Sequence, residues 1–448
     1  MPLPGPTRVL SRPHARDVLL TPRALLWLPV AGVALGQPFL MPGVSAADAC
    51  LALFIPLALA ALLRLRALPP LPAWTPWLAA FCLWALVGGA WLAARGEPAF
   101  SAVEFAKSAC KLLFYSTAAV LLALAARLEP EERVQRVVLW SFAVAAAVAV
   151  ALYAGMVAGM PLARDLACGE AWPCNAAYYY ERRWFGDSSP RGLREGVFVR
   201  AVGLASEPAR LGQLMSLALG YLLLGTRGAW RRPWPLALIA AAAVLAFSLS
   251  GYALLVPVLA LAGLRLLGEE RRVRRGAALA ALAVVAASAA VPPVRATLEG
   301  PISRRAHRFL SGQGGDESAR LRLLGSWDMA LLLVERHPLG GVGLGHFDRH
   351  VPEIKDQLPG GHALDERVQG WNALAYVLAT TGIVGALLFV FVCYRALRPR
   401  PALGAVFLLG MFADGTVLGP AFWVFLALYS DAGRRAGPAA PFTAAPPG

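Results

Sequence analysis

The chain has 448 residues, of which 58% are hydrophobic and 15% charged, with a formal net charge of +15. A mean hydropathy of +0.57 over this length excludes an ordinary soluble globular protein and indicates an integral membrane protein. The positive charge is carried by arginine, since the only lysines are Lys107, Lys111 and Lys355. High-GC coding and contact with anionic lipid account for part of this excess.

Apolar stretches of membrane-spanning length follow one another along the chain. They lie near 24–41, 46–63, 73–94, 105–126, 137–159, 206–225, 234–249, 252–267, 276–291, 371–394 and 402–429. The last stretch is interrupted at Asp414, Gly415, Gly419 and Pro420, which predicts two short helices. The sequence therefore predicts an all-α bundle of about 12 transmembrane helices.

The arginines predict the orientation, because positive residues in short loops stay cytoplasmic. They place both termini in the cytoplasm and turn two long loops outward. The predicted units are a cytoplasmic segment at 1–23, helices one to five at 24–159, an outward loop at 160–205, helices six to nine at 206–292, a large outward loop at 293–370, helices ten to twelve at 371–429 and a disordered tail at 430–448. Trp74, Trp84 and Trp91 fit anchoring at the membrane interface.

The first outward loop mixes aromatic and basic side chains, among them Tyr179 beside Arg182. Aromatic faces near cations suit a sugar, and an interfacial loop at headgroup level fits equally well. Single-stranded nucleic acid would match such a surface, but the outward location makes it improbable. Cys168 and Cys174 share this loop, where an oxidising compartment would allow a disulfide.

One motif leads from this loop into the next span. Pro208 stands where a helix would begin, preceded by Ser206 and Glu207. Helix N-termini bind phosphate, and Arg200 and Arg210 could add bidentate contacts to a diphosphate. Glu207 could instead pair with one of these arginines.

A second motif lies in the large outward loop, which also holds Arg304 and several histidines. The apolar spacing from Leu321 to Val334 predicts an amphipathic helix lying on the membrane. A glycine-rich run at 338–345 follows it and would allow a close backbone approach to a ligand. A dinucleotide site is excluded here because no strand precedes the run.

A third motif opens the next span with Trp371 and Asn372 and continues to Thr380, Thr381 and the Gly382 to Gly385 run. Together, in this order, the three motifs resemble the superfamily of O-antigen ligases and O-antigen or exopolysaccharide polymerases, over roughly Arg200 to Phe391. That resemblance implies a bacterial inner-membrane glycosyltransferase with its active site on the periplasmic side. It also implies an undecaprenyl-diphosphate-linked glycan as donor, with no cofactor and no metal.

In such enzymes arginines hold the diphosphate leaving group, and a base, usually a histidine of the late loop, deprotonates the acceptor hydroxyl. Carried onto this chain, Arg200 and Arg210 take the first diphosphate-binding role, and Arg320 or Arg322, with Arg304, the second. The histidine expected directly before Asn372 is replaced by Trp371. The candidate bases are His362, then His346 and Glu207, with Asp365 and Glu366 also in reach. Trp371, Asn372 and Tyr179 are the candidate sugar or acceptor contacts.

Three functions remain open at this point. A polymerase would join repeat units on the lipid carrier, and a ligase would move the finished glycan to lipid A core or another acceptor. Ser248 to Tyr252 lacks the arginine that ligase-like members tend to carry in that turn, which favours the polymerase. A flippase for the same lipid-linked sugar is less favoured, because transporters place charges inside their spans. A chain-length regulator and a flippase are the protein partners that the resemblance suggests, alongside membrane lipid, and nucleic acid is not expected.

Overall fold

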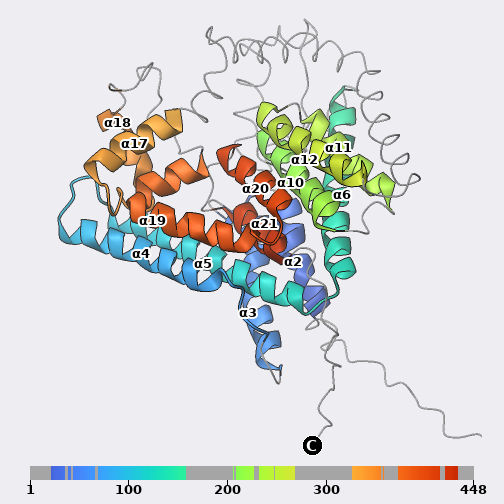
Figure 1. The fold of residues 1–448 in the computed structure, drawn as a ribbon, viewed down its shortest axis with the longest axis horizontal. Helices are drawn as coiled ribbons and strands as arrows, with labels where there is room; N and C mark the ends of the chain where they lie inside the picture. The colour runs from blue at the N-terminus through green and yellow to red at the C-terminus, as the bar shows by residue number, and fades with distance from the viewer. Residues whose placement is uncertain are drawn as a thin grey trace, which may run out of the picture.

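The computed structural model describes residues 22–35, 39–41, 44–65, 69–157, 205, 208–226, 232–246, 248–267, 325–354, 357, 372–413 and 419–431. These residues are mostly helical, as predicted, and one short hairpin joins β1 (Phe39–Met41) to β2 (Val44–Ser45). Figure 1 shows α4, α5 and α19 side by side in one arm of the molecule and α6, α10, α11 and α12 grouped in the other.

The described helices overlap the predicted apolar stretches, except for two that lie in the predicted large outward loop, at Ser326–Arg336 and Phe347–Ile354. They are α2 (Pro22–Ala34), α3 (Ala46–Leu63), α4 (Thr75–Ala94), α5 (Ala102–Arg127), α6 (Glu131–Val157), α10 (Pro208–Gly220) with the π-helical turn η1 (Tyr221–Gly225), α11 (Pro233–Leu245), α12 (Leu249–Leu267), α17 (Ser326–Arg336), α18 (Phe347–Ile354), α19 (Ala373–Leu397), α20 (Pro401–Ala413) and α21 (Pro420–Asp431). The predicted division of the last stretch into two short helices is confirmed by α20 and α21.

Within the described ranges, five helices are long and apolar enough to cross a membrane, namely α3, α4, α5, α6 and α19. Shorter apolar helices lie at 25–34, 209–225, 233–245, 250–265 and 401–412. The predicted total of about 12 is not confirmed by these helices, and the span near 276–291 lies outside the described residues.

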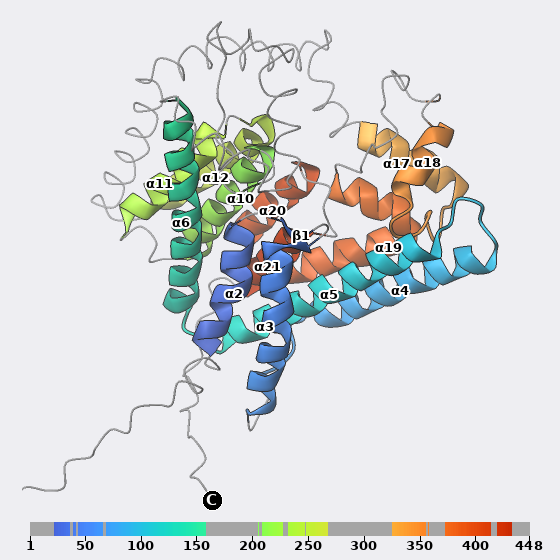
Figure 2. The same ribbon diagram turned by 180° about the vertical axis from the view of Figure 1, so that it is seen from behind.

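Most of these helices share one hydrophobic core, and α10 and α12 approach each other closely within it. Gly212 faces Gly251, and a Cβ atom on either residue would lie about 3 Å from the Cα of the other. The Ser216 hydroxyl also donates a hydrogen bond to the Gly251 carbonyl at 3.2 Å. The segment from Ser248 to Tyr252 therefore forms the start of α12 and packs against the first part of α10. Figure 2 shows these two helices in the same group.

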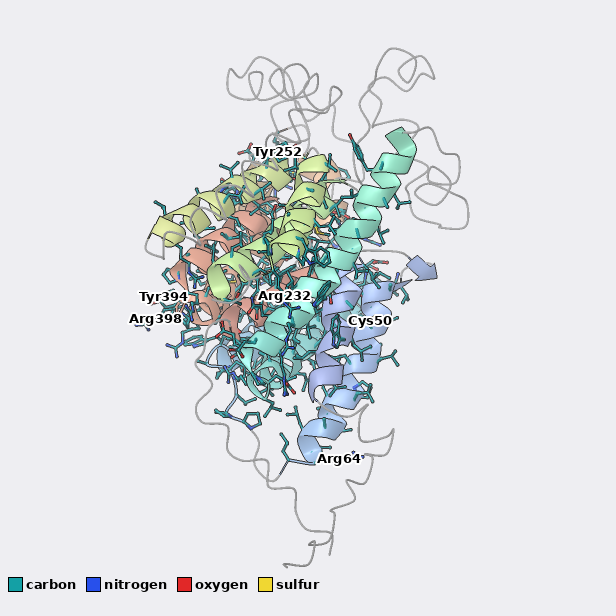
Figure 3. All side chains as sticks on the ribbon, turned by 90° about the vertical axis from the view of Figure 1, so that its right-hand side faces the viewer. Cys50, Arg64, Arg232, Tyr252, Tyr394 and Arg398 are labelled. Carbon is teal, nitrogen blue, oxygen red and sulfur yellow. The ribbon has the colours of Figure 1, made fainter. Side chains whose placement is uncertain are left out.

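Several helix ends meet on one face of the bundle. The Arg127 guanidinium at the end of α5 lies 3.1 Å from an Asp431 carboxylate oxygen at the end of α21 and donates to the Pro70 carbonyl before α4. Figure 3 shows Arg64, at the end of α3, and Tyr252, in the first turn of α12, toward opposite ends of the molecule. The predicted orientation, in which Arg64 and Arg127 share the cytoplasmic side, stays a prediction.

Helix α19 is interrupted at Gly382, whose φ of 67° and ψ of −171° are not helical. The glycine-rich run inserts at this break. Val342 N–H donates to the Ala379 carbonyl at 2.9 Å, Gly343 N–H to the Thr380 carbonyl at 3.0 Å, and Ile383 N–H to the Pro338 carbonyl at 2.9 Å. The glycines are therefore needed for a close approach. The predicted partner was a ligand, whereas the described part of the run approaches the backbone of α19.

We expect Gly382→Ala to destabilise the fold, because alanine is strained at this φ and its Cβ would collide with the Leu339 carbonyl. The expected loss is about 2 kcal/mol or more of unfolding free energy. The measurement is the yield and melting temperature of the protein in detergent. Gly263→Ala on α12 is the matched control, since a Cβ there would meet no atom within 4 Å. Equal melting temperatures for both variants would contradict this account of the break.

Candidate functional site

Arg210 lies in the first turn of α10 and lines a cavity between helices. Gln213 follows one turn later on the same side of the helix, so the two polar side chains face one space. The cavity is small, with a volume of about 70 Å³, which is below the usual range for a small-molecule site. The remaining wall is apolar or small and consists of Val33, Ala47, Leu214, Leu217, Leu254, Phe407, Gly410, Met411, Gly419, Pro420, Ala421 and Phe422.

Parts of six helices line the cavity. Its lining comes from the end of α2, the start of α3, the first halves of α10 and α12, the second half of α20 and the start of α21. In the predicted orientation each of these segments lies toward the outward side. The loop 160–205 leads into α10, which places Arg210 next to a predicted outward segment.

The chemistry of this cavity suits an amphiphilic anion. A guanidinium offers a planar fork of donors that matches phosphate oxygens, and Gln213 adds an amide. The apolar wall next to them would accept a hydrocarbon chain. Gly410 leaves room on that wall, because a Cβ there would lie 3.5 Å from Leu217 and 3.9 Å from Leu254.

A second, smaller hydrophobic cluster packs the late segment 326–354 against α19. On α17 the apolar face of Met329, Ala330 and Leu333 meets Ala375 and Ala379 of α19. From α18, Phe347, Val351 and Ile354 complete the cluster. The predicted amphipathic helix is present as α17 from Ser326 onward, and α18 and α19 contact its apolar face.

The two regions touch through α17 and α20. The Trp327 ring lies 6.4 Å from the Phe412 ring, measured between centroids, and Phe412 adjoins Met411 of the cavity wall.

His346 is fully buried and both of its ring nitrogens face backbone groups. Its Nε2 accepts from the Ser101 N–H at 2.8 Å, so the ring proton resides on Nδ1, which donates to the Leu344 carbonyl at 2.9 Å. The ring also stacks on Phe100 with centroids 4.7 Å apart. Burial lowers the pKa of His346, and the hydrogen bonds to the Leu344 and Ser101 backbone act in the opposite direction. The neutral ring joins the turn before α5 to the late segment.

Two further histidines lie close together on α17 and α18. The rings of His337 and His350 are 6.0 Å apart between centroids, and His350 Nδ1 lies 3.3 Å from a Glu353 carboxylate oxygen. Arg336 approaches the same oxygen at 3.6 Å. Burial lowers the pKa of His337, and the nearby carboxylate of Glu97 acts in the opposite direction. Across the described residues, no group of three or more His, Cys, Asp or Glu side chains could hold a metal ion.

Asn372 is buried and begins α19. Its Oδ1 accepts from the N–H groups of Leu374 at 3.0 Å and Ala375 at 3.1 Å, which is an N-cap. Its Nδ2 has no hydrogen-bond partner among the described atoms. Asn372, which was predicted to contact sugar, therefore caps a helix. Its position directly before the helix indicates this role in the sequence.

Only three of the predicted site residues fall in the described part of the chain. These are Arg210 in the cavity, His346 in the buried turn and Asn372 at the start of α19. The predictions for Arg200, Glu207, Arg304, Arg320, Arg322, His362, Trp371 and Tyr179 lie outside the described residues, as do Cys168 and Cys174. Sequence reasoning missed Gln213, although its i, i+3 spacing from Arg210 was a usable signal.

The apolar helices indicate an integral membrane protein. Residues 234–390 match the family model described as O-antigen ligase. This match confirms the predicted resemblance to the O-antigen ligase and polymerase superfamily over about a third of the chain, and it supports a membrane enzyme of the glycosyl-transfer type. No curated protein matches the chain.

The matched stretch runs from the start of α11 into α19. It contains the glycine-rich run, Asn372 and the break at Gly382, and it ends almost where the predicted resemblance ends. Arg210 and Gln213 precede it, so the cavity combines matched and unmatched helices.

We expect acidification to weaken the junction at His346. Because its folded pKa is lowered below the ordinary value of 6.5, the neutral ring contributes its full stability above about pH 6.5 and loses it as pH falls further. His337 shifts in the same direction. Melting temperature in detergent, measured from pH 7.5 to 5, should fall, and His346→Gln should be less stable at pH 7.5 but show a shallower fall. An identical pH slope in His346→Gln would contradict the assignment.

Proposed function

We propose that the protein is a membrane glycosyltransferase that acts on an undecaprenyl-diphosphate-linked glycan at the periplasmic face of the bacterial inner membrane. Its reaction is the polymerisation of O-antigen or exopolysaccharide repeat units by inverting transfer. The observation that carries the proposal is the Arg210 cavity, where a guanidinium and the Gln213 amide lie beside an apolar wall, as a diphosphate and its prenyl chain would require.

In this reaction the acceptor hydroxyl loses its proton to a base, and its oxygen attacks the anomeric carbon from the face opposite the diphosphate. The bond between that carbon and the diphosphate oxygen then breaks. Negative charge develops on the leaving diphosphate, where guanidinium groups stabilise the transition state. Arg210 supplies this contact in the cavity, with Arg200, Arg304, Arg320 and Arg322 proposed as further donors.

His362 and Glu207 remain the proposed bases. His346 is a weaker candidate, because both of its ring nitrogens already bond backbone groups and its ring is buried. Trp371, Asn372 and Tyr179 are proposed to contact the sugar or the acceptor. Trp371 stands where related enzymes usually have a histidine, so the base must come from elsewhere in the chain.

A ligase that transfers the completed glycan to lipid A core or another acceptor is the second candidate, and the O-antigen ligase match favours it. The absence of an arginine between Ser248 and Tyr252 favours polymerisation, because ligase-like members of the superfamily tend to carry one there. A flippase is the third candidate and has the least support, because the arginines gather at helix ends and in loops.

Arg210→Ala should abolish glycan extension in a strain deleted for the chromosomal copy, because the leaving group loses its bidentate donor. Arg210→Lys should restore little, since an ammonium lacks the planar fork. Glycan length is measured on gels, with lipid-linked intermediates measured by mass spectrometry. Arg95→Ala is the control, because Arg95 is an exposed arginine at the end of α4 whose guanidinium stacks on Trp91. Wild-type glycan in the Arg210→Ala strain, at equal protein level, would refute the proposed site.

The same strains separate the candidate reactions. Loss of a polymerase leaves glycans of one repeat unit on the cell surface, and loss of a ligase strands full-length glycan on the lipid carrier. Loss of a flippase keeps single lipid-linked repeats on the cytoplasmic leaflet.

Gly410→Leu should fill the cavity between Leu217 and Leu254 and obstruct the proposed seat of the prenyl chain. We expect the KM for the lipid-linked donor to rise about ten-fold or more, because a side chain of that size removes roughly 1.5–3 kcal/mol of apolar contact. The assay is transfer by purified enzyme over a range of donor concentrations. Gly263→Leu, on a part of α12 where added atoms meet open space, is the control. An unchanged KM would place the prenyl chain elsewhere.

A further inference from the structure

At the break in α19, three carbonyl groups accept hydrogen bonds from outside the helix. In an unbroken helix the carbonyls of Ala379, Thr380 and Thr381 would accept from residues 383, 384 and 385. Here Val342 and Gly343 supply backbone N–H groups to the first two, and the Trp84 indole Nε1 donates to the Thr381 carbonyl at 3.0 Å. Unsatisfied carbonyls at membrane depth cost several kcal/mol each, so these donors are what make the break tolerable.

Trp84 is the one side chain among these three donors, and it comes from α4. Its ring can approach because Gly385 has no Cβ, which would lie 3.1 Å from Trp84 Cδ1. One turn along α4, Gly88 similarly admits the Gly340 carbonyl, whose oxygen would lie 3.3 Å from a Cβ atom on Gly88. The surroundings of Trp84 therefore favour contact with α19 and the glycine-rich run. The predicted role of Trp84 as an anchor at the membrane interface does not describe these contacts.

The break divides α19 into halves with different surroundings. The first half carries Asn372 and packs on α17 through Ala375 and Ala379. The second half packs on α4, where the Phe81 and Phe389 rings lie 5.2 Å apart. Figures 1 and 2 both show α17 beside the first part of α19 and α4 alongside its length.

Because of this division, a change in the angle at Gly382 would swing the first half of α19 about that residue. Asn372 precedes Gly382 by ten residues, or about 15 Å of helix. A change of about 20° in the kink would move Asn372 by about 5 Å. Displacements of about 1 Å already cost enzymes large factors in rate.

We infer that Trp84 is a positioning residue for glycan transfer: by donating to the Thr381 carbonyl, it holds the break in α19 and so sets the place of Asn372 and α17 relative to the Arg210 cavity. The inference rests on the proposed function, because it assumes that α19 and α17 present the acceptor side of the reaction. Trp84 touches no reacting atom and acts through α19.

The first test does not depend on activity. Trp84→Phe keeps an aromatic ring and removes the N–H, so amide hydrogen exchange should rise at least five-fold in peptides covering 338–346 and 373–385. Trp91→Phe is the control, because Trp91 lies on the same helix, is 57% exposed and stacks with Arg95. Unchanged exchange in Trp84→Phe would overturn the inference.

The second test separates positioning from simple loss of stability. In Trp84→Phe we expect kcat, per folded enzyme, to fall at least ten-fold while the KM for the lipid-linked donor stays within two-fold, since the cavity is built by other helices. Raised exchange with an unchanged kcat would overturn the positioning role. So would a loss of folded protein with full activity in the remainder.

The two proposals fail in different ways. If the wild-type protein transfers no glycan from a lipid-linked donor, the proposed function fails. If the wild type transfers glycan and Trp84→Phe does so equally well, only the positioning role fails. Arg210→Ala with full activity would remove the cavity assignment and leave the Trp84 result standing.

Discussion

A helix inside a membrane can be interrupted only where other groups replace the hydrogen bonds that its backbone loses. At Gly382 these groups come from two distant parts of the chain, the glycine-rich run after α17 and Trp84 of α4. The late segment is therefore joined to α19 through backbone atoms as well as through side-chain packing. The positions of α17, α18 and the buried His346 all depend on this junction.

The fold was largely predictable because hydropathy alone marks long apolar helices. The interruption at Asp414 to Pro420 was also visible, since glycine and proline end helices for local steric reasons. The partner of the glycine-rich run was not visible. Glycine spacing announces a close approach, but only the tertiary structure shows that Gly341 and Gly343 meet α19, some forty residues later in the chain.

The site was less predictable than the fold, for similar reasons. Arginine before a span and histidine in a late loop are common, and the sequence does not distinguish an exposed histidine from one whose nitrogens are both bonded. His346 shows the difference, because the residues that contact its ring, Ser101 and Phe100, lie in a turn that is distant in the sequence. Arg210 was identifiable because it follows Pro208 at the start of a predicted helix, where backbone N–H groups and a guanidinium can bind phosphate together.

The cavity and the junction divide the proposed reaction between two parts of the bundle. Arg210 and Gln213 stand on α10, which is fixed by its glycine contact with α12. Asn372 stands on the first half of α19, which is fixed by the late segment. The parts meet where Trp327 of α17 packs against Phe412 of α20. A transferase needs this arrangement more than a carrier does, because donor and acceptor must be held at a fixed separation, whereas a carrier must let its substrate pass.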